Sequence, residues 1–312
     1  MIVLYLRAVA IAGVRTSYAK DWIVDMTTIT ADETSSNAYC RRVGDITITA
    51  LRDGYFDLPL AYFSGLDAGE SERLLRSASR AVPPRIDVNA FLIEAGGKRL
   101  LVDTGCGNKL GPTVNKLRHN LAASGVAEAS IDTVLCTHIH PDHTNGLIDE
   151  SGAPVFTNAE IVVHEAEMQF WLSEAQMEKA PEALKPQFRW AMDAFAPYRE
   201  RIRTFRQGSI ASGIEAVPLH GHTPGHSGFL VHSGTEQLLI WADCVHSISI
   251  QAAHPEVSFA ADVDPDTARA TRQRLFDQVS TDRLLVTGMH LEFPGFGYLV
   301  RAGQSFRYET IV

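Results

Sequence analysis

The sequence predicts an α/β fold in which two mixed sheets pack face to face with helices on the outside. Both halves of the chain give short apolar stretches typical of strands first and helical patterns afterwards. The 312 residues include 45% hydrophobic and 21% charged residues, the composition of a globular protein with a full core. No repeat period or low-complexity segment interrupts the pattern, so residues 39–312 are predicted to form one domain.

The first residues are predicted to lie outside this domain. The stretch MIVLYLRAVAIAGVRTSYAK has the apolar residues of a signal peptide, but no positive charge precedes them and Arg7 interrupts them. It is also too short and too broken to span a bilayer. Residues 1–38 are therefore predicted to be a disordered segment, a translated extension or a targeting segment. A cytoplasmic location is expected, with the periplasm or the exterior as the alternative if the stretch is an export signal.

In the first half, strands precede a helix and a further strand. Residues 45–58, DITITALRDGYFDL, alternate around Asp-Gly, which predicts a strand, a turn and a second extended piece. Residues 88–105, VNAFLIEAGGKRLLVDTG, predict two strands joined by a Gly-Gly hairpin turn. A helix is predicted over 111–125, where Leu and Val recur at helical spacing. Residues 131–138, IDTVLCTH, then predict a buried strand.

The second half repeats this order. Strands are predicted within 159–167, 212–221 and 282–290, and two more within 227–243, SGFLVHSGTEQLLIWAD. Residues 264–280, DPDTARATRQRLFDQVS, predict a helix with an acidic first turn. Between the halves, residues 167–202 predict two amphipathic helices split by Pro181.

Residues 137–146, THIHPDHTNG, hold a cluster of polar side chains at the end of a predicted strand. Pro141 lacks the N–H that a strand needs, so the strand ends here and the cluster lies on a loop. On such a loop His138 and His140 point the same way, while Asp142 and His143 turn toward a neighbouring point. The spacing predicts a site for two adjacent metal ions.

This cluster is too small to complete such a site, because each ion needs more ligands than it supplies. Further His or Asp residues are therefore expected where other strands end. His222, Asp243 and His290 each follow directly on an apolar stretch that predicts a strand. These three residues are the remaining candidate ligands.

Five short motifs, in this order, resemble those of the metallo-β-lactamase fold superfamily. They are DTG at Asp103, HIHPDH at 138–143, GHTPGHS at 221–227, AD at Asp243 and MH at His290. The resemblance runs from about residue 40 to the end and implies an αββα sandwich with a dinuclear site along one edge. It assigns the first metal to His138, His140 and His222, the second to Asp142, His143 and His290, and a bridging position to Asp243.

Two longer segments narrow the resemblance. LRDGYFDLPL at 51–60 and HLEFPGFGYLVRAGQSFRY at 290–308 are similar to methyl parathion hydrolase and related lactonases. The implied activity is hydrolysis of a lactone or an aryl ester, and an organophosphate triesterase is the alternative. A β-lactamase is a further alternative, although such enzymes usually lack a bridging aspartate at the position of Asp243. A metal-binding redox or sensing protein is the non-hydrolytic alternative.

The expected cofactor is a pair of divalent ions, zinc first, with iron, manganese or cobalt as alternatives. Two ions sharing one water would give a bridging hydroxide as the nucleophile. Asp142 is the candidate that carries a proton to the leaving alkoxide. Asp103 is expected to accept the ring proton of a ligand histidine, and His246 either orients a ligand or lies in the core. His226 is expected to be structural.

Residues 167–202, between the HIHPDH and GHTPGHS motifs, predict a pocket for an apolar substrate. Six aromatic side chains are candidates for its wall, although most aromatics in such a segment belong to a core. They are Phe170, Trp171, Trp190 and Phe195 of the inserted helices, with Phe293 and Phe296 beside His290. The expected substrate therefore carries a hydrophobic acyl or aryl group.

Charge and cysteine content bound the partners. The net charge of −9, with no cluster of Lys and Arg, argues against nucleic acid as a partner. No stable insertion into a membrane is expected, and the formation of a homodimer is left open. The four cysteines are too few and too scattered for a disulfide framework. A disulfide between Cys106 and Cys136 is left open.

Overall fold

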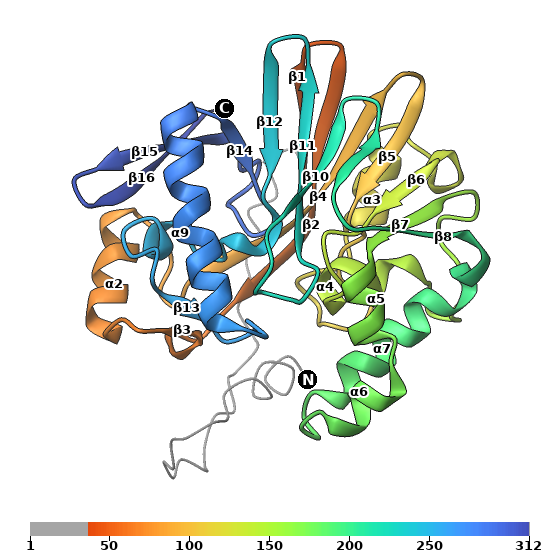
Figure 1. Cartoon of the computed structure of the whole chain (residues 1–312), viewed down its shortest axis with the longest axis horizontal. Coiled ribbons are helices and arrows are strands. Elements are labelled where there is room, and N and C mark those ends of the chain that lie inside the picture. The colour runs from red at the N-terminus through yellow and green to blue at the C-terminus, as the bar shows by residue number, and fades with distance from the viewer. Residues whose placement is uncertain (1–36, 312) are drawn as a thin grey trace.

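The computed structural model describes residues 37–311 and confirms the predicted α/β fold, with two mixed sheets facing each other between helices (Figure 1). The first sheet has the spatial order β1 (Ala38–Val43), β2 (Ile46–Asp57), β4 (Arg85–Ala95), β5 (Lys98–Val102), β6 (Thr133–Leu135), β7 (Glu160–His164) and β8 (Ile202–Phe205). The second has the order β16 (Ser305–Thr310), β15 (Gly297–Ala302), β14 (Leu285–Thr287), β12 (Glu236–Ile240), β11 (Ser227–Ser233), β10 (Ile214–Pro218) and β9 (Gly208–Ala211). The predicted extension of residues 1–38 lies almost wholly outside the described residues.

Helices cover the outer face of each sheet. Figure 1 shows the helices of the middle of the chain beside the first sheet and α9 beside the second. The α-helices are α2 (Ala68–Ser77), α3 (Leu117–Ala123), α4 (Pro141–Thr144), α5 (Glu165–Trp171), α6 (Glu174–Lys179), α7 (Lys185–Phe195), α8 (Ile248–Gln251) and α9 (Pro265–Asp282). The 3-10 helices of the described residues are η1 (Leu60–Tyr62), η2 (Glu128–Ser130), η3 (Asn145–Leu147), η4 (Ala196–Arg201) and η5 (Ala242–Cys244). In the described part of the chain, no helix combines the length and apolar character needed to cross a bilayer.

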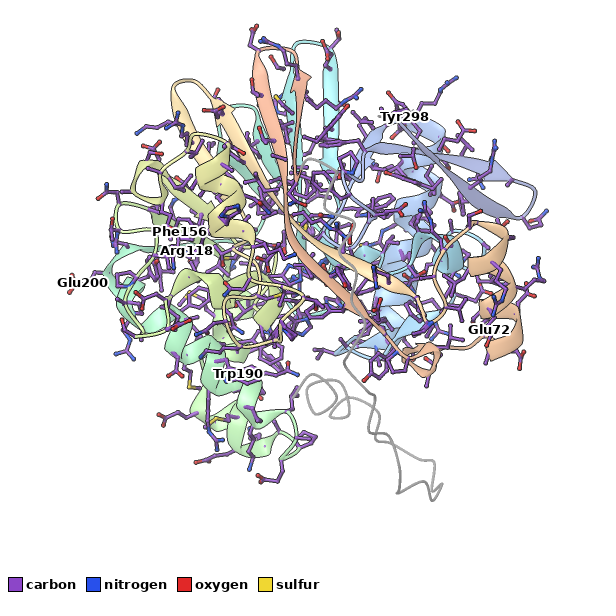
Figure 2. All side chains as sticks on the ribbon, turned by 180° about the vertical axis from the view of Figure 1, so that it is seen from behind. Glu72, Arg118, Phe156, Trp190, Glu200 and Tyr298 are labelled. Carbon is purple, nitrogen blue, oxygen red and sulfur yellow. The ribbon has the colours of Figure 1, made fainter. Side chains whose placement is uncertain are left out.

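Central strands such as β4 and β14 are buried on both faces, which explains their largely apolar sequences. In β4, Phe91 and Ile93 point between the two sheets, whereas Ala90 and Leu92 point toward the helices that cover the first sheet. This alternation follows from the two-residue period of a strand. Figure 2 shows side chains filling these layers, with Glu72 and Glu200 at opposite edges of the molecule.

Two turns that the sequence predicts have different outcomes. The Gly-Gly hairpin is confirmed, because β4 and β5 pair antiparallel through Ala95 and Lys98. The prediction of an Asp-Gly turn is wrong, because β2 is one continuous strand whose pairing with β4 shifts between Arg52 and Gly54. The cause is Asp53, which is buried at this bulge and accepts main-chain N–H groups from the loop after β5.

The helices differ from prediction mainly in their boundaries. The helix expected over 111–125 is confirmed only as α3, because the Asp53 carboxylate holds the N–H groups of Lys116 and Leu117 and fixes its start. The helices expected over 167–202 are three, α5, α6 and α7, because Ser173 caps a separate short helix before Pro181. Helix α9 and the strands predicted in the second half are confirmed.

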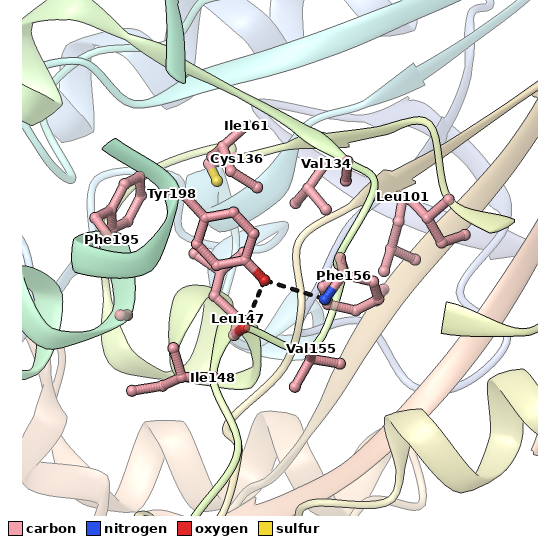
Figure 3. Close-up of a cluster of buried hydrophobic side chains, with 14 of the residues drawn as sticks. Leu101, Val134, Cys136, Leu147, Ile148, Val155, Phe156, Ile161, Phe195 and Tyr198 are labelled. Carbon is pink, nitrogen blue, oxygen red and sulfur yellow. Dashed lines mark hydrogen bonds between the residues drawn. The ribbon is translucent and has the colours of Figure 1, made fainter. Parts of the chain in front are cut away.

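Tyr198 links the end of the inserted helices to the segment between α4 and β7. Its hydroxyl donates to the carbonyl of Leu147 at 2.7 Å and accepts the N–H of Phe156 at 3.0 Å (Figure 3). The ring lies in a fully buried apolar cluster with Cys136 and Phe195. The helical segment is therefore part of the core and does not stand apart from it.

A third, two-stranded sheet closes one end of the sandwich. It pairs β3 (Phe63–Ser64) with β13 (Ser258–Phe259), so that Phe63 lies opposite Phe259. The two rings are 5.3 Å apart, centre to centre, in an apolar cluster that is separate from the space between the main sheets. This small sheet forms one flank of the region where the polar loops meet.

Candidate metal centre

The polar cluster of the first half lies where β6 ends. The strand stops at Leu135, and Pro141 then opens the single-turn helix α4, which carries Asp142 and His143. His138 and His140 precede this turn on the loop, as predicted. All four polar side chains are buried at the edge of the sheet.

The second half brings its polar residues to the same edge. His222 lies on the loop between β10 and β11, Asp243 on the turn η5 after β12, and His290 on the loop after β14. The His290 loop is held against β4, since Asn89 donates from its side chain to the carbonyl of Leu291 at 2.8 Å. The structure therefore brings together all seven residues that the sequence singles out.

One carboxylate oxygen, Oδ2 of Asp243, lies at the centre of the arrangement. It is 3.0 Å from Nε2 of His290, 3.3 Å from Nε2 of His222 and 3.4 Å from Nε2 of His143. Nε2 of His138 lies slightly farther away, at 3.8 Å. This is the geometry of a carboxylate placed between two groups of imidazoles.

The ligand atoms fall into two sets on either side of Asp243. Nitrogen atoms of His138, His140 and His222 lie within 4.8 Å of one another, and so do the ligand atoms of the other set. That other set comprises Asp142, His143 and His290. These groupings have the same members as the two ligand sets that the family resemblance implies.

Several of these atoms are buried without a hydrogen bond. In the described residues, Nε2 of His138, Nε2 of His143 and Oδ1 of Asp243 have no hydrogen-bond partner. Buried polar atoms are rarely left in this state, because each one costs free energy. A set of nitrogen and oxygen donors facing one another in this way fits divalent cations, zinc among them.

Neighbouring oxygen atoms fix the orientation of the ligand rings. Nδ1 of His143 donates to Oδ2 of Asp103 at 2.7 Å, which agrees with the role expected for Asp103. Nδ1 of His290 donates to the main-chain carbonyl of Asp87 at 2.8 Å. In both rings the Nε2 atom is thereby left to face the centre.

His222 has a partner that the sequence did not reveal. Its Nδ1 donates to Oδ1 of Asp262 at 2.9 Å, and Asp262 is itself held by the N–H of Phe259. Asp262 stands two residues before Asp264, whose side chain caps the start of α9. From the sequence alone the two acids look like equivalent capping candidates, so no signal separates them.

The local electrostatics favour cations. Burial lowers the pKa of His222, but the carboxylates of Asp243 and Asp262 outweigh it and raise that pKa to about 9. Burial also opposes ionisation of Asp243, yet the surrounding imidazoles hold its pKa well below the usual value. A bound divalent cation would displace the protons that these carboxylates attract.

Two further histidines lie beside the ligands. His226 donates from Nδ1 to the carbonyl of Leu219 at 2.7 Å and accepts the N–H of Asp243 at Nε2, so it supports the chain and does not face the centre. His246 is 1% exposed, and its Nε2 lies 3.3 Å from Oδ2 of Asp243. Its ring stacks on the ring of Phe259, with 3.7 Å between the ring centres.

A cavity adjoins the ligands, and its other walls are apolar. Besides His246, ligands from both sets reach its surface: His140, Asp142, His222, Asp243 and His290. The apolar walls come from the end of β2, the start of β4, the loop after β5 and the segment around β13. They are Phe56, Leu58, Ile86, Leu110, Phe259 and Ala261.

The pocket wall predicted from the sequence needs correction, because none of its six aromatic residues lines this cavity. Phe195, the last residue of α7, and Phe296 are core residues: Phe195 belongs to the cluster between the helices and the first sheet, and Phe296 to the cluster between the two sheets. Phe293 packs against the core between the sheets, and Phe170 against the ring of Trp171. Trp190 is partly buried and packs against the apolar cluster that contains the cavity walls.

Trp171 has a different position from that predicted. Its ring is fully buried and lies 5.2 Å, centre to centre, from the ring of His140. It therefore packs behind a ligand and does not border the cavity. The thiols of Cys106 and Cys136 are both free and buried, in different apolar clusters, so the disulfide left open by the sequence is absent from the described structure.

Comparison with known proteins gives consistent matches over most of the chain. The family model described as the metallo-beta-lactamase superfamily matches residues 83–290, a range that contains all seven candidate ligands. The crystal structure of hydrolase AbOPH in the beta-lactamase superfamily aligns with 90% of this chain and 99% of that one, at 29% identity and a TM-score of 0.85. AidC, described as a dizinc quorum-quenching lactonase, aligns with 89% of this chain and 100% of its own, at 25% identity and a TM-score of 0.83.

More distant structures share the fold. A probable metal-dependent hydrolase from Staphylococcus aureus aligns with 87% of this chain and 100% of its own, at 20% identity and a TM-score of 0.71. A search of curated proteins gave no match.

Proposed function

Because this chain belongs to the metallo-β-lactamase superfamily and gathers seven metal-binding side chains beside an apolar cavity, we propose that it is a dinuclear metal-dependent hydrolase of lactones or aryl esters. The observation that carries the proposal is the position of Asp243, whose Oδ2 lies between the two sets of ligands. A second candidate, hydrolysis of a phosphotriester, uses the same site. The substrate distinguishes the two.

The two ions would be held by His138, His140 and His222 on one side and by Asp142, His143 and His290 on the other, with Asp243 between them. When bound, such a pair supplies an activated water and polarises a carbonyl or phosphoryl oxygen. We propose zinc, because all three ligands of the first set are imidazoles and two of the three in the second set are imidazoles as well.

The side chains of the chain itself have separate tasks in this proposal. The carboxylate of Asp142 borders the cavity, and its Oδ2 lies 3.5 Å from Nε2 of His290. From there it can pass a proton to the oxygen of the leaving group. Asp103 and Asp262 keep the rings of His143 and His222 oriented, so the ligand nitrogens stay aimed at the centre.

The cavity supports a substrate with a hydrophobic acyl or aryl group. Its non-ligand walls are aliphatic or aromatic side chains, apart from His246. Burial of an apolar group against such walls makes binding more favourable, by about 0.8 kcal/mol for each buried methylene. The ester or lactone carbonyl would then lie at the polar end, beside Asp142 and Asp243.

We also propose that the protein works in a reducing compartment such as the cytoplasm. All four cysteines are free in the described structure, and three of them are buried. Free thiols are typical of proteins that are not exposed to oxidising conditions.

The test is a hydrolysis panel on protein whose metal content has been measured. The substrates are acyl-homoserine lactones, aromatic lactones, aryl esters, methyl parathion and a β-lactam. His140→Ala should lower kcat/KM more than about 100-fold, since a ligand is lost. The matched control is His119→Ala, which removes an exposed histidine on α3 and should keep both the metals and the activity.

The outcomes separate the candidates. Turnover of lactones or aryl esters that depends on His140, with about two ions per chain, supports the proposed activity. Preference for methyl parathion would favour the phosphotriesterase. Two bound ions with no turnover of any substrate would contradict a hydrolase and favour a redox or sensing role.

A further inference from the structure

Glu167 is a fully buried carboxylate that lies against two of the loops that carry the candidate ligands. It lies in the first turn of α5 and is 0% exposed. Its Oε2 accepts the main-chain N–H of Ile139 at 2.8 Å, and its Oε1 accepts the N–H of Gly225 at 2.6 Å. An ionised carboxylate is costly to bury, so these two charge-assisted hydrogen bonds are strong constraints on both loops.

The two N–H groups belong to different loops of the centre. Ile139 stands between His138 and His140, and its side chain is buried in the core, so the peptide is held on both sides. Gly225 stands on the loop of His222, which comes from the other sheet. One carboxylate thus connects the loops that supply the three histidines of one ligand set.

The packing of α5 against the second loop leaves no room for adjustment. A Cβ at Gly225 would lie 2.5 Å from Nδ1 of His164 and 3.0 Å from Cγ of Glu167, so a side chain there would push the helix away. His164 caps the start of α5 by accepting the N–H of Ala166. The helix therefore presents Glu167 at a fixed distance from both loops.

The same face of α5 carries a second contact with this ligand set. Trp171 follows Glu167 by four residues, so the two side chains point to the same side of the helix. The indole ring packs on the ring of His140, as described above. The two hydrogen bonds of Glu167 and the ring contact of Trp171 thus all reach the loops or rings of this ligand set.

We propose that Glu167 is a positioning residue that sets the spacing between the His138–His140 loop and the His222 loop. It thereby controls the affinity for the ion held by these three histidines, and it leaves the other ion site largely unaffected. The inference rests on the metal centre of the proposed function. It does not depend on which substrate is hydrolysed.

The test variant is Glu167→Gln, which keeps the shape of the side chain. Its amide oxygen can accept one N–H, but its NH2 group meets the other N–H as a second donor, so one anchor is lost. The matched control is Asp53→Asn. Asp53 is another buried carboxylate that accepts main-chain N–H groups, but from a loop that supplies none of the seven ligands.

The experiment measures zinc affinity by chelator competition in two backgrounds that each retain one set of three ligands. His143→Ala retains His138, His140 and His222, and His222→Ala retains Asp142, His143 and His290. Glu167→Gln should weaken zinc binding about 10- to 100-fold in the first background and less than about threefold in the second. The visible absorption of the Co2+-loaded proteins, which reports ligand geometry, should change only in the first background.

Each result bears on the proposal. Equal losses in both backgrounds, or a loss that Asp53→Asn reproduces, would show that Glu167 only stabilises the fold and would overturn it. A parent chain that binds fewer than one ion would overturn it together with the metal centre. A parent chain that binds two ions and hydrolyses nothing would contradict the proposed function while leaving this comparison of affinities decisive.

Discussion

Oδ1 of Asp262 lies 2.9 Å from Nδ1 of His222, although the two residues are 40 positions apart in the chain. The contact joins the loop before α9 to the loop between β10 and β11. It holds the His222 ring so that Nε2 faces Asp243 at 3.3 Å. The aspartate also supplies negative charge behind the ring, which makes the imidazole a better ligand.

Asp262→Asn is expected to weaken zinc binding about 10- to 100-fold, because the ring loses the charge behind it and the amide oxygen can accept from only one of the two donors, His222 and Phe259. The measurement is zinc affinity by chelator competition. Asp264→Ala is the control, since it removes the helix cap of α9 two residues away. That variant should lose about 1 kcal/mol of stability and no zinc affinity. Unchanged affinity in Asp262→Asn would refute the role of this contact.

Enlarging a wall of the cavity should change substrate selection. Ala261→Leu adds three carbon atoms beside the ligands, so it should discriminate against substrates with long acyl or aryl groups by about 10-fold in kcat/KM. Short esters should be affected much less. The measurement is kcat/KM across a series of esters of increasing chain length.

Phe195→Leu is the control for Ala261→Leu, and it tests whether the aromatic residues that the sequence predicted are outside the substrate pocket. Phe195→Leu changes an aromatic residue that the sequence placed in the pocket wall and the structure places in the core. It should lower thermal stability and leave the chain-length preference as it is. A shift in preference in Phe195→Leu, with none in Ala261→Leu, would be evidence against the cavity as the substrate site.

Removal of the metals should destabilise the folded chain. Bound ions stabilise only the folded state, by about 4 kcal/mol when the free ion is at 1,000 times its Kd. A chelator should therefore lower Tm by on the order of 10 °C. His140→Ala should show a smaller chelator effect, since one ligand set is already incomplete. Equal Tm values with and without chelator in the parent protein would argue that no metal is bound.

Tyr198→Phe should reduce the free energy of unfolding by about 2 kcal/mol, because the carbonyl of Leu147 and the N–H of Phe156 lose their partner (Figure 3). Burial raises the pKa of Tyr198 to about 12, above the value near 10 of an unfolded chain. The folded state then holds a proton that the unfolded state releases. The stability that the protonated phenol of Tyr198 contributes to the fold is thus complete below about pH 10 and is lost as the pH rises toward 12.

Urea unfolding of both proteins at several pH values checks this prediction. The stability difference between the parent protein and Tyr198→Phe should be constant below about pH 10 and should shrink above it. A difference that grows with pH would mean that the phenol is not protonated in the fold as described.

The sequence predicted the sheets and the ligands for the same physical reason. Strands buried on both faces leave long apolar stretches, and a polar residue that follows such a stretch, as His222 or Asp243 does, stands out against it. The Asp-Gly pair of β2 gave a wrong turn prediction, because the role of Asp53 depends on a loop far away in the sequence. Only the structure shows that Asp53 binds the N–H groups of that loop instead of forming a turn.

The cavity and the supporting acids could not be predicted for a related reason. Ala261 and Leu110 are ordinary apolar residues whose role depends on which segments meet at the centre. Asp262 and Glu167 act on partners far away in the sequence, and each sits in the first turn of a helix or just before one, where acids are common without any site nearby. Aromatic composition, which suggested Phe195 and Phe296, marked core residues.

Each ligand set takes two residues from the first sheet and one from the second, with Asp243 shared between them. While the chain is being synthesised, the nascent first half already carries His138, His140, Asp142 and His143, yet neither set is complete. The face of Phe91 and Ile93 is also bare at that stage, because the second sheet that covers it does not yet exist. On the proposed function, a chain that holds both ions must therefore already have brought its two sheets together.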